Sequence, residues 1–191
     1  MAEIIELETS RLRLRQWSEA DYPAFALINA DADVMQYYPA ILSTVESDSL
    51  AQKFESLIAE RGWGFWAVEL VKSKKFIGFV GLNEPTYDLP VTPCEEIGWR
   101  IAREYWGYGY ATEAAKAVLA VAFGKLGLSE VYSFTPVSNK KSRAVMGGLG
   151  MVDTMNNFEH PLVPDNSPLR THVLYKVDKQ SWLKIRQNQE R

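Results

Sequence analysis

A glycine-rich turn that runs directly into a strong helix pattern is the feature that most constrains the fold of this 191-residue chain. It occupies Trp106 to Ala114, where Gly107 and Gly109 alternate with larger residues. Glycines let successive backbone N–H groups converge without an intervening Cβ, and the following helix adds the partial positive charge of its N-terminus. The turn therefore predicts a cradle for a pyrophosphate group. An ordinary left-handed turn before a core helix is the structural alternative.

Composition excludes several classes of protein. A chain of this length with 47% hydrophobic residues suits one domain over residues 1–191, and its net charge of −3 gives no general field for nucleic acid or an anionic membrane. The acidic N-terminal segment does not resemble a signal peptide, and the longest apolar run, 117–123, is far shorter than the ~20 residues of a bilayer span. We therefore expect a cytoplasmic protein that binds neither nucleic acid nor membrane, as a monomer or homodimer.

Cysteine and histidine usage predicts no metal site. The single Cys94 excludes an intramolecular disulfide, and His160 and His172 are too far from it in the sequence to form a metal-spaced cluster. His160 precedes a proline in a polar loop, so we expect it at the surface.

Hydrophobic periodicity predicts an α/β fold with a sheet of mixed direction. The alternation from Arg11 to Arg15 indicates a strand with leucines facing in and arginines on a solvated face. Serine-led caps open two helices, between which an aromatic segment, Met35–Pro39, is a candidate pocket wall. This order lacks the alternating βα units of a dinucleotide-binding Rossmann domain. The expected helices are 18–30, 43–61, 112–125, 139–149 and 180–187, and the further strands are 64–70, 76–82, 95–101, 130–136 and 169–177.

Four blocks of the sequence resemble a known family in their order and spacing. They are similar to the GNAT superfamily of N-acetyltransferases and, within it, to the ribosomal-protein N-terminal acetyltransferases of the RimJ/RimL type. The resemblance covers nearly the whole chain. It implies a single domain with a mixed, mostly antiparallel central sheet of about six to seven strands flanked by helices, with a splayed and bulged strand at the cofactor site. The blocks are Thr9–Arg15, Glu96–Trp99, Trp106–Ala114, and Asn139-x-x-Ser142 ending at Gly150-Met151.

This resemblance implies acetyl-CoA as donor and direct transfer of its acetyl group to a primary amine, on a protein N-terminus or a small molecule. Trp106 departs from the first residue of the general family motif, as the ribosomal-type branch does. A backbone N–H of the strand around Arg100 would form the oxyanion site, a contribution of ~3 kcal/mol. The implied coenzyme-binding residues are Trp99, Arg100, Ile101, Trp106, Gly107, Tyr108, Gly109, Tyr110, Ala111, Thr112, Asn139 and Ser142.

The acceptor amine is protonated at neutral pH, so transfer requires a base. The resemblance places Glu96 in this role, with Glu95, Glu84 or water as alternatives. Strand alternation puts Glu95 and Glu96 on opposite faces, so at most one faces the acceptor cleft; a solvated carboxylate is the structural alternative. The candidate acceptor-site residues are Tyr37, Tyr38, Trp66 and Glu84, of which the aromatic ones are also ordinary core candidates.

The departing thiolate benefits from a proton donor, which is a tyrosine in many family members. Met146 takes that place here and has no proton to donate. We therefore assign Ser142 to the sulfur and Asn139 to the pantetheine; helix capping is the alternative for both. Gly147-Gly148 late in the same helix indicates either close approach of coenzyme or partner, or fraying. Direct transfer does not need Cys94 as a nucleophile.

Two rival functions stay open at this point. Met146 leaves room for a non-catalytic acyl-CoA-binding or sensing module, which would keep the cradle without turnover. A nucleotide-binding domain would use the glycine turn for ATP or NAD instead of coenzyme A.

Overall fold

The computed structural model describes residues 2–189, which divide into two compact units. The first comprises the residues up to Asn83 together with Gly98–Val118, and the second comprises Glu84–Ile97 and the residues from Leu119 onward. The predicted class is confirmed, with a mostly antiparallel sheet, helices and one parallel strand pair. A single domain over residues 1–191 stays a prediction.

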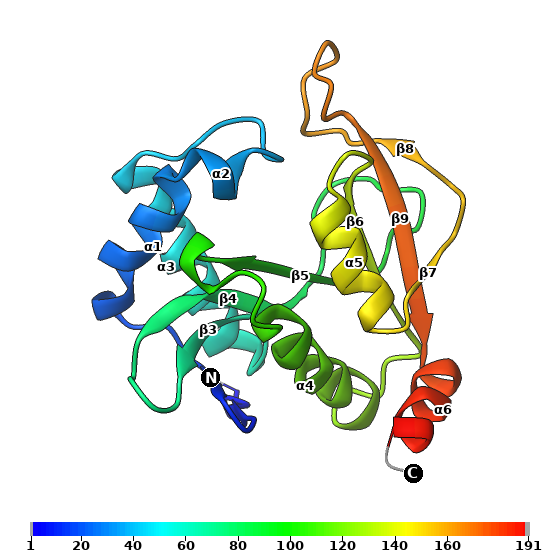
Figure 1. Cartoon of the computed structure of the whole chain (residues 1–191), viewed down its shortest axis with the longest axis horizontal. Helices are drawn as coiled ribbons and strands as arrows, with labels where there is room; N and C mark the ends of the chain where they lie inside the picture. The colour runs from blue at the N-terminus through cyan, green and yellow to red at the C-terminus, as the bar shows by residue number, and fades with distance from the viewer. Residues whose placement is uncertain (1, 190–191) are drawn as a thin grey trace. The chain divides into compact units, whose positions relative to one another are not determined.

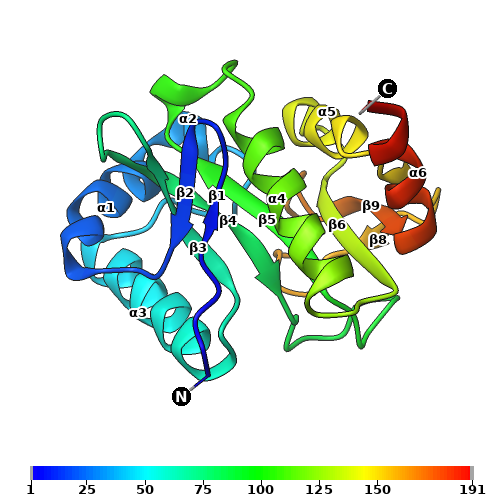
Figure 2. The same cartoon turned by 90° about the horizontal axis from the view of Figure 1, so that it is seen from below.

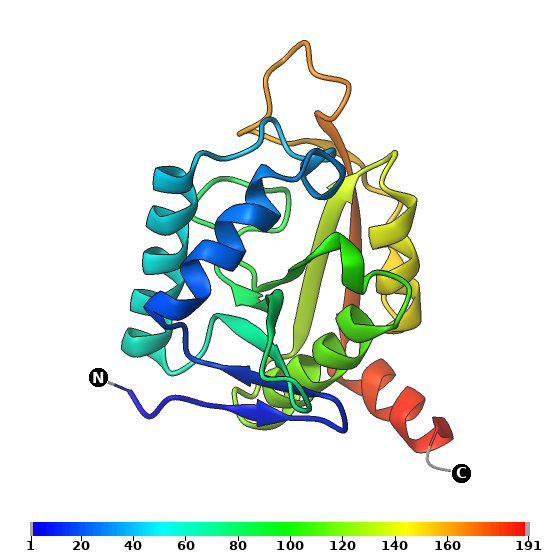
Figure 3. The ribbon, with the colours of Figure 1, turned by 60° about the vertical axis from the view of Figure 1, so that its left-hand side comes forward.

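The strands of the first unit follow the order β1-β2-β3-β4-β5, and β1 to β4 pair antiparallel. Figure 2 shows β1 beside β2. Leu12 and Leu14 of β2 are wholly buried, as their alternation predicts. Helices α1 and α3 lie side by side (Figures 1 and 3). The strands are β1 Leu7–Glu8, β2 Leu12–Arg15, β3 Phe65–Leu70, β4 Phe76–Asn83 and β5 Glu96–Ile101. The helices are α1 Tyr22–Ala30, α2 Ala32–Met35, α3 Thr44–Arg61 and α4 Tyr110–Gly124. Strand β5 and helix α4 each have residues in both units.

Local capping chemistry fixes the helix starts. The Ser43 hydroxyl accepts the Glu46 N–H at 3.3 Å while the Glu46 carboxylate accepts the Ser43 N–H at 2.8 Å, so α3 begins where the capping box predicts. The predicted 18–30 helix instead opens with a 3-10 turn over Glu19–Asp21, because the Asp21 carboxylate is held by the Ser18 N–H and by Arg15.

The prediction of a solvated arginine face on β2 is wrong for Arg15. Its guanidinium binds Asp21 at 2.8 Å and Glu69 at 2.9 Å, and the side chain is only 16% exposed. Two carboxylates from neighbouring elements compensate for the loss of water around the cation. Arg13 pairs with Glu6 and stays 42% exposed, so it fits the prediction.

The core of the first unit is an aromatic cluster. Its ring centroids lie 4.9 to 6.5 Å apart in edge and tilted contacts, which hold α1 and α3 against β3 and β4. The members are Trp17, Phe25, Phe54, Phe65, Phe76 and Phe79.

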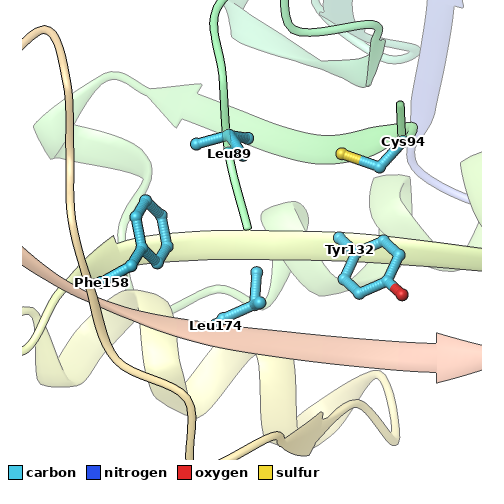
Figure 4. Close-up of a cluster of buried hydrophobic side chains, with 5 residues drawn as sticks. All are labelled: Leu89, Cys94, Tyr132, Phe158 and Leu174. Atoms are coloured by element: carbon cyan, nitrogen blue, oxygen red, sulfur yellow. The ribbon is translucent and has the colours of Figure 1, made fainter. Parts of the chain in front are cut away.

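The strands of the second unit follow the order β5-β6-β9-β7, and β8 also pairs with β9. Strands β6 and β9 pair antiparallel along the whole of β6, whereas β5 pairs parallel with β6 at one recorded position, Glu96 opposite Tyr132. Helix α5 packs against β6 (Figure 1), and Figure 4 shows the core around Leu89 and Cys94. The elements are β6 Glu130–Pro136, β7 Val152–Asp153, β8 Phe158–Glu159, β9 Thr171–Asp178, α5 Lys140–Gly148 and α6 Lys179–Gln189.

Residues 2–189 form nine strands, more than the predicted six to seven. The additional strands β1, β7 and β8 have two residues each, too few for an alternating pattern to show. The recorded register shift lies between β3 and β4, where Val68 pairs with Gly78 and Glu69 with Phe76. A bulge on β5 itself stays a prediction. No described helix has the length and apolar character needed to cross a membrane.

Candidate active site

The glycine turn forms an open loop at the start of α4. Gly107 has a φ of +82° and Gly109 of +79°, conformations that residues with a Cβ rarely adopt. A Cβ added at Gly107 would meet no described atom within 4 Å, and one added at Gly109 would meet only the Arg11 guanidinium, at 3.7 Å. The space over both glycines is therefore open. Together with the N-terminus of the 15-residue α4, this geometry fits a pyrophosphate cradle.

Trp106 anchors this loop instead of lining it. Its indole Nε1 donates to the Ile101 carbonyl at 2.8 Å, and its ring packs against the cluster of Ile28, Val34 and Met35. The tryptophan thereby ties the loop to the end of β5. Because the tryptophan side chain points into this contact, a large residue at position 106 is compatible with a ligand that is bound by the main-chain groups of the loop.

A clamp from the beginning of the chain holds the other side of the loop, and sequence reasoning missed it. Arg11 Nε contacts the Glu113 carboxylate at 2.6 Å, its Nη1 donates to the Tyr108 carbonyl at 3.0 Å, and its guanidinium lies 4.5 Å from the Tyr110 ring centroid. Thr9 donates to Glu113 at 2.6 Å. Burial acts to raise the pKa of Glu113, but hydrogen bonds from Thr9 and Arg11 outweigh it and lower that pKa.

On β5, the side chain of Arg100 extends toward α1. It is 8% exposed; Nη1 donates to Asn29 Oδ1 at 2.6 Å, and Asn29 Nδ2 donates to the Ser47 hydroxyl at 2.8 Å. Gly78 of β4 has a φ of +137°, and a Cβ there would clash with the Arg100 carbonyl oxygen. Glycine at 78 therefore permits the close approach of β5. Of the neighbouring predicted residues, Trp99 is half-buried and Ile101 is buried.

The predicted acceptor-site aromatics have different surroundings. The Tyr38 ring is 37% exposed and lies over the Arg100 guanidinium at 4.2 Å, and Tyr37 is half-buried. Trp66 is completely buried and its indole donates to the Ile5 carbonyl at 2.7 Å, so we assign it to the core. A groove of about 580 Å³ in this unit is bordered by α1, α2 and Ala102–Tyr105, and sequence reasoning did not find it.

In the second unit, Glu96 lies at the start of β5. Burial and the negative charge of Glu96 raise the pKa of Tyr87. The pKa of Cys94 is raised to about 11, mostly by burial and to a smaller extent by the negative charges of Glu96 and Glu95. Cys94 is 8% exposed and protonated at neutral pH, which makes it a poor nucleophile. Glu84 is exposed on the loop that follows β4.

Helix α5 presents Asn139 and Ser142. Asn139 caps the helix by accepting the Ser142 N–H at 3.2 Å, and its Nδ2 donates to the Thr135 hydroxyl at 2.9 Å, so the capping alternative holds for this residue. Within residues 2–189, the Ser142 hydroxyl has no hydrogen-bond partner. Met146 is fully buried, which suits an apolar side chain in place of tyrosine.

The surface placement of His160 is wrong. His160 and His172 are 7% and 6% exposed with ring centroids 4.7 Å apart, because both pack against Phe134 and Phe158. Burial, together with the neighbouring His172, lowers the pKa of His160 to about 4, so His160 is neutral at pH 7. The described part of the chain holds no group of three or more side chains suited to a metal ion.

The predicted residues thus fall into separate groups. The first unit holds the glycine loop, which Arg11 contacts, and separately the pair of Arg100 and Tyr38. The second holds Glu96 near Tyr87 and Cys94, and the pair of Asn139 and Ser142.

Comparison with known families identifies the chain. A family model described as an acetyltransferase (GNAT) domain matches residues 11–152. The chain belongs to the GNAT acetyltransferase family. It is therefore an acyltransferase, as the sequence predicts. The matched residues include parts of both units.

Individual relatives agree with this family. The chain is 30% identical over 146 residues to the Uncharacterized N-acetyltransferase YoaA of Bacillus subtilis, covering 75% of this chain and 81% of the relative. It is 33% identical over 128 residues to the FsC-acetyl coenzyme A-N(2)-transacetylase of Aspergillus fumigatus, covering 65% of this chain. The matched region spans about half of that relative, 54% of its length.

The fold is also shared with solved structures. Mycobacterium smegmatis RimJ in complex with CoA-disulfide aligns with a TM-score of 0.70 at 20% identity, over 88% of this chain and 82% of RimJ. The predicted resemblance to GNAT enzymes with a RimJ-like fold is confirmed. Neither the sensing module nor the ATP- or NAD-binding domain finds support among these relatives.

Proposed function

We propose that this GNAT enzyme transfers the acetyl group of acetyl-CoA directly to a primary amine while both are bound. The observation that carries the proposal is the open loop of Gly107 and Gly109 at the N-terminus of α4. Acetyl-CoA, when bound, supplies the acetyl group as an activated thioester. The rest of the chemistry falls to the residues of this chain.

The first unit serves the donor. Main-chain N–H groups of the loop and the start of α4 bind the pyrophosphate, while Arg11 and Trp106 hold the loop in place. The main chain of Trp99–Ile101 pairs with the pantetheine arm, and one of its N–H groups stabilises the negative charge that develops on the acetyl carbonyl oxygen. These contacts need the backbone path of β5 more than its side chains.

The second unit supplies the proton transfers. Glu96 accepts a proton from the acceptor amine, directly or through water, and Glu95 and Glu84 are its alternatives. Ser142, whose hydroxyl has no protein partner in the described chain, donates a hydrogen bond to the departing sulfur. Asn139 keeps one amide N–H and one carbonyl lone pair beyond its two hydrogen bonds, which suits the pantetheine.

The acceptor is a protein N-terminal α-amine or a small-molecule amine. An α-amine, with a pKa of about 8, loses its proton more readily than a lysine side chain, with a pKa of about 10.4, so an α-amine makes the smaller demand on Glu96. The fungal relative carries N(2)-transacetylase in its name, and a ribosomal-protein acetyltransferase shares this fold. The cytoplasmic location and a monomeric or homodimeric state stay predictions.

Initial-rate kinetics test direct transfer. With acetyl-CoA and an amine varied together, thiol release should give intersecting reciprocal plots, as expected of a ternary complex. The Cys94→Ala variant should keep the wild-type kcat, because the buried thiol is not a nucleophile. Parallel plots, or loss of transfer by Cys94→Ala with coenzyme binding intact, would contradict direct transfer.

A further inference from the structure

Arg100 is the least satisfied buried polar group in the described part of the chain. Its Nε is buried and has no hydrogen-bond partner among residues 2–189, and the residue as a whole is 8% exposed. No ion pair of Arg100 with a carboxylate is recorded in those residues; Asn29, a neutral amide, is its hydrogen-bond partner. A buried cation without an anion is costly, so this arrangement requires an explanation.

The geometry of the guanidinium shows which edge is unused. Nη1 is occupied by Asn29 Oδ1 at 2.6 Å. Nε and Nη2 share the opposite edge of the planar group, and neither has a recorded protein partner in residues 2–189. Two parallel N–H donors on one edge match the two oxygens of a carboxylate.

The surroundings hold this edge in a fixed orientation. Asn29 is itself fixed by the buried Ser47 hydroxyl at 2.8 Å, so the amide cannot rotate away from Nη1. The guanidinium lies 4.2 Å from the centroid of the Tyr38 ring and 5.4 Å from that of Phe79, which cover it with aromatic surface. These contacts stabilise a positive charge but do not neutralise it.

The strand that carries Arg100 connects this group to the chemistry. Arg100 and Glu96, the proposed base, are four residues apart on β5, an even spacing that puts both side chains on one face of a regular strand. Tyr38, on the loop between α2 and α3, is 37% exposed, and its ring packs on the guanidinium. A carboxylate held by this guanidinium therefore places the acceptor beside β5, the strand that carries the proposed base.

We propose that the Nε and Nη2 edge of Arg100 binds a carboxylate of the acceptor, so that the preferred substrates are amines that also carry a carboxylate. This inference rests on the proposed acetyl transfer and specifies its substrate class. The carboxylate supplies the anion that the protein does not, and the amine of the same molecule is thereby oriented on β5. Amines without a carboxylate leave the guanidinium unpaired and are poorer acceptors.

Matched pairs of acceptors test the proposal. Thiol release from acetyl-CoA is measured with each amino acid against its α-amide, and with C-terminally amidated tripeptides containing aspartate against the same amidated tripeptides containing asparagine. For accepted pairs we expect the carboxylate to have at least a tenfold higher kcat/KM, and this preference to fall to about one in Arg100→Gln with the KM for acetyl-CoA unchanged. Equal use of both members, or preference for the amide, would overturn the inference.

Two further variants separate recognition from folding. Arg100→Lys keeps the charge but loses the two-donor edge, so its carboxylate preference should lie between those of wild type and Arg100→Gln. Where Arg100→Gln does not fold, a preference in Arg100→Lys that is weaker than in wild type supports the inference, and an unchanged preference contradicts it. Arg103→Gln removes a 62% exposed arginine paired with Asp33 and should keep the wild-type preference. Transfer to amines that shows no carboxylate preference contradicts only this inference; no acetyl-CoA-dependent transfer to any amine contradicts the proposed function as well.

Discussion

The glycine loop and the surroundings of Arg100 lie in the same unit but are encoded differently. The loop is built from consecutive residues whose main chain makes the cradle, and both glycines show the positive φ that requires them. The Arg100 site takes one group each from β5, α1 and the loop between α2 and α3. Sites made of local backbone can be read from a sequence, whereas sites assembled from distant side chains need the fold.

The largest expected effect is on the rate of transfer. It tests whether a side chain of β5 acts in the chemical step while the glycine loop binds the coenzyme. Glu96→Gln should lower kcat by ~10²-fold or more, because it removes the proposed base, and leave the acetyl-CoA affinity unchanged. Steady-state rates and calorimetry measure the two quantities. Glu95→Gln is the matched control and should keep most of kcat. Loss of activity in Glu95→Gln with Glu96→Gln active would move the base to the other face of the strand.

The opposite pattern is expected when the loop is changed. Gly109→Ala places a Cβ at a φ of +79°, at a cost of ~1–2 kcal/mol, and fills the open cradle, so acetyl-CoA should bind at least ~10-fold more weakly by calorimetry. Gly127→Ala carries similar strain at a φ of +69° with no described atom within 4 Å of the added Cβ. It should lose stability without losing affinity. Equal affinity loss in both variants would make strain alone the cause.

Ser142→Ala gives a smaller effect on the rate. The loss of the hydrogen bond to the sulfur should lower kcat by roughly 3- to 10-fold at pH 7, the cost of one neutral hydrogen bond. The free energy of unfolding should stay close to that of wild type, because the hydroxyl has no protein partner in the described chain. Ser138→Ala, an exposed neighbour, is the control. A loss of kcat that comes with a matching loss of stability would indicate that Ser142 only supports the helix.

Much of the fold follows from local pattern, and the departures have physical causes. Strand β6 was predicted at its observed bounds, and α3 at its capping box, because alternation and caps are local. The ion pairs of Arg15 and the burial of His160 depend on partners far away in the sequence. No single-sequence pattern signals such partners.

The candidate site divides in the same way. The glycine loop and the capping Asn139 were visible as short motifs. The sequence pattern predicted Arg11 only as part of an alternating strand. Its contact with the loop was not predicted, because its partner Glu113 follows about a hundred residues later. Arg100 was chosen for its backbone, and its unused edge emerges only when Asn29 and Tyr38 are in place.

The smallest expected effect concerns Gly147, whose requirement for glycine nothing in the described structure explains. An added Cβ would meet no described atom within 4 Å, and the residue lies inside α5. Gly147→Ala should therefore raise the free energy of unfolding by ~0.5–1 kcal/mol, measured by denaturant titration. Unchanged acetyl-CoA affinity would support fraying as the reason for glycine, and weaker binding would support close approach of the coenzyme.

Calorimetric titration of the wild-type protein with acetyl-CoA, ATP and NAD tests the central claim most directly. A cradle at Trp106–Ala114 that serves a GNAT enzyme predicts saturable binding of acetyl-CoA at one site per chain, weakened at least ~10-fold in Gly109→Ala and unchanged in Gly127→Ala. It also predicts that ATP and NAD bind far more weakly. Tight binding of ATP or NAD without binding of acetyl-CoA would contradict the account.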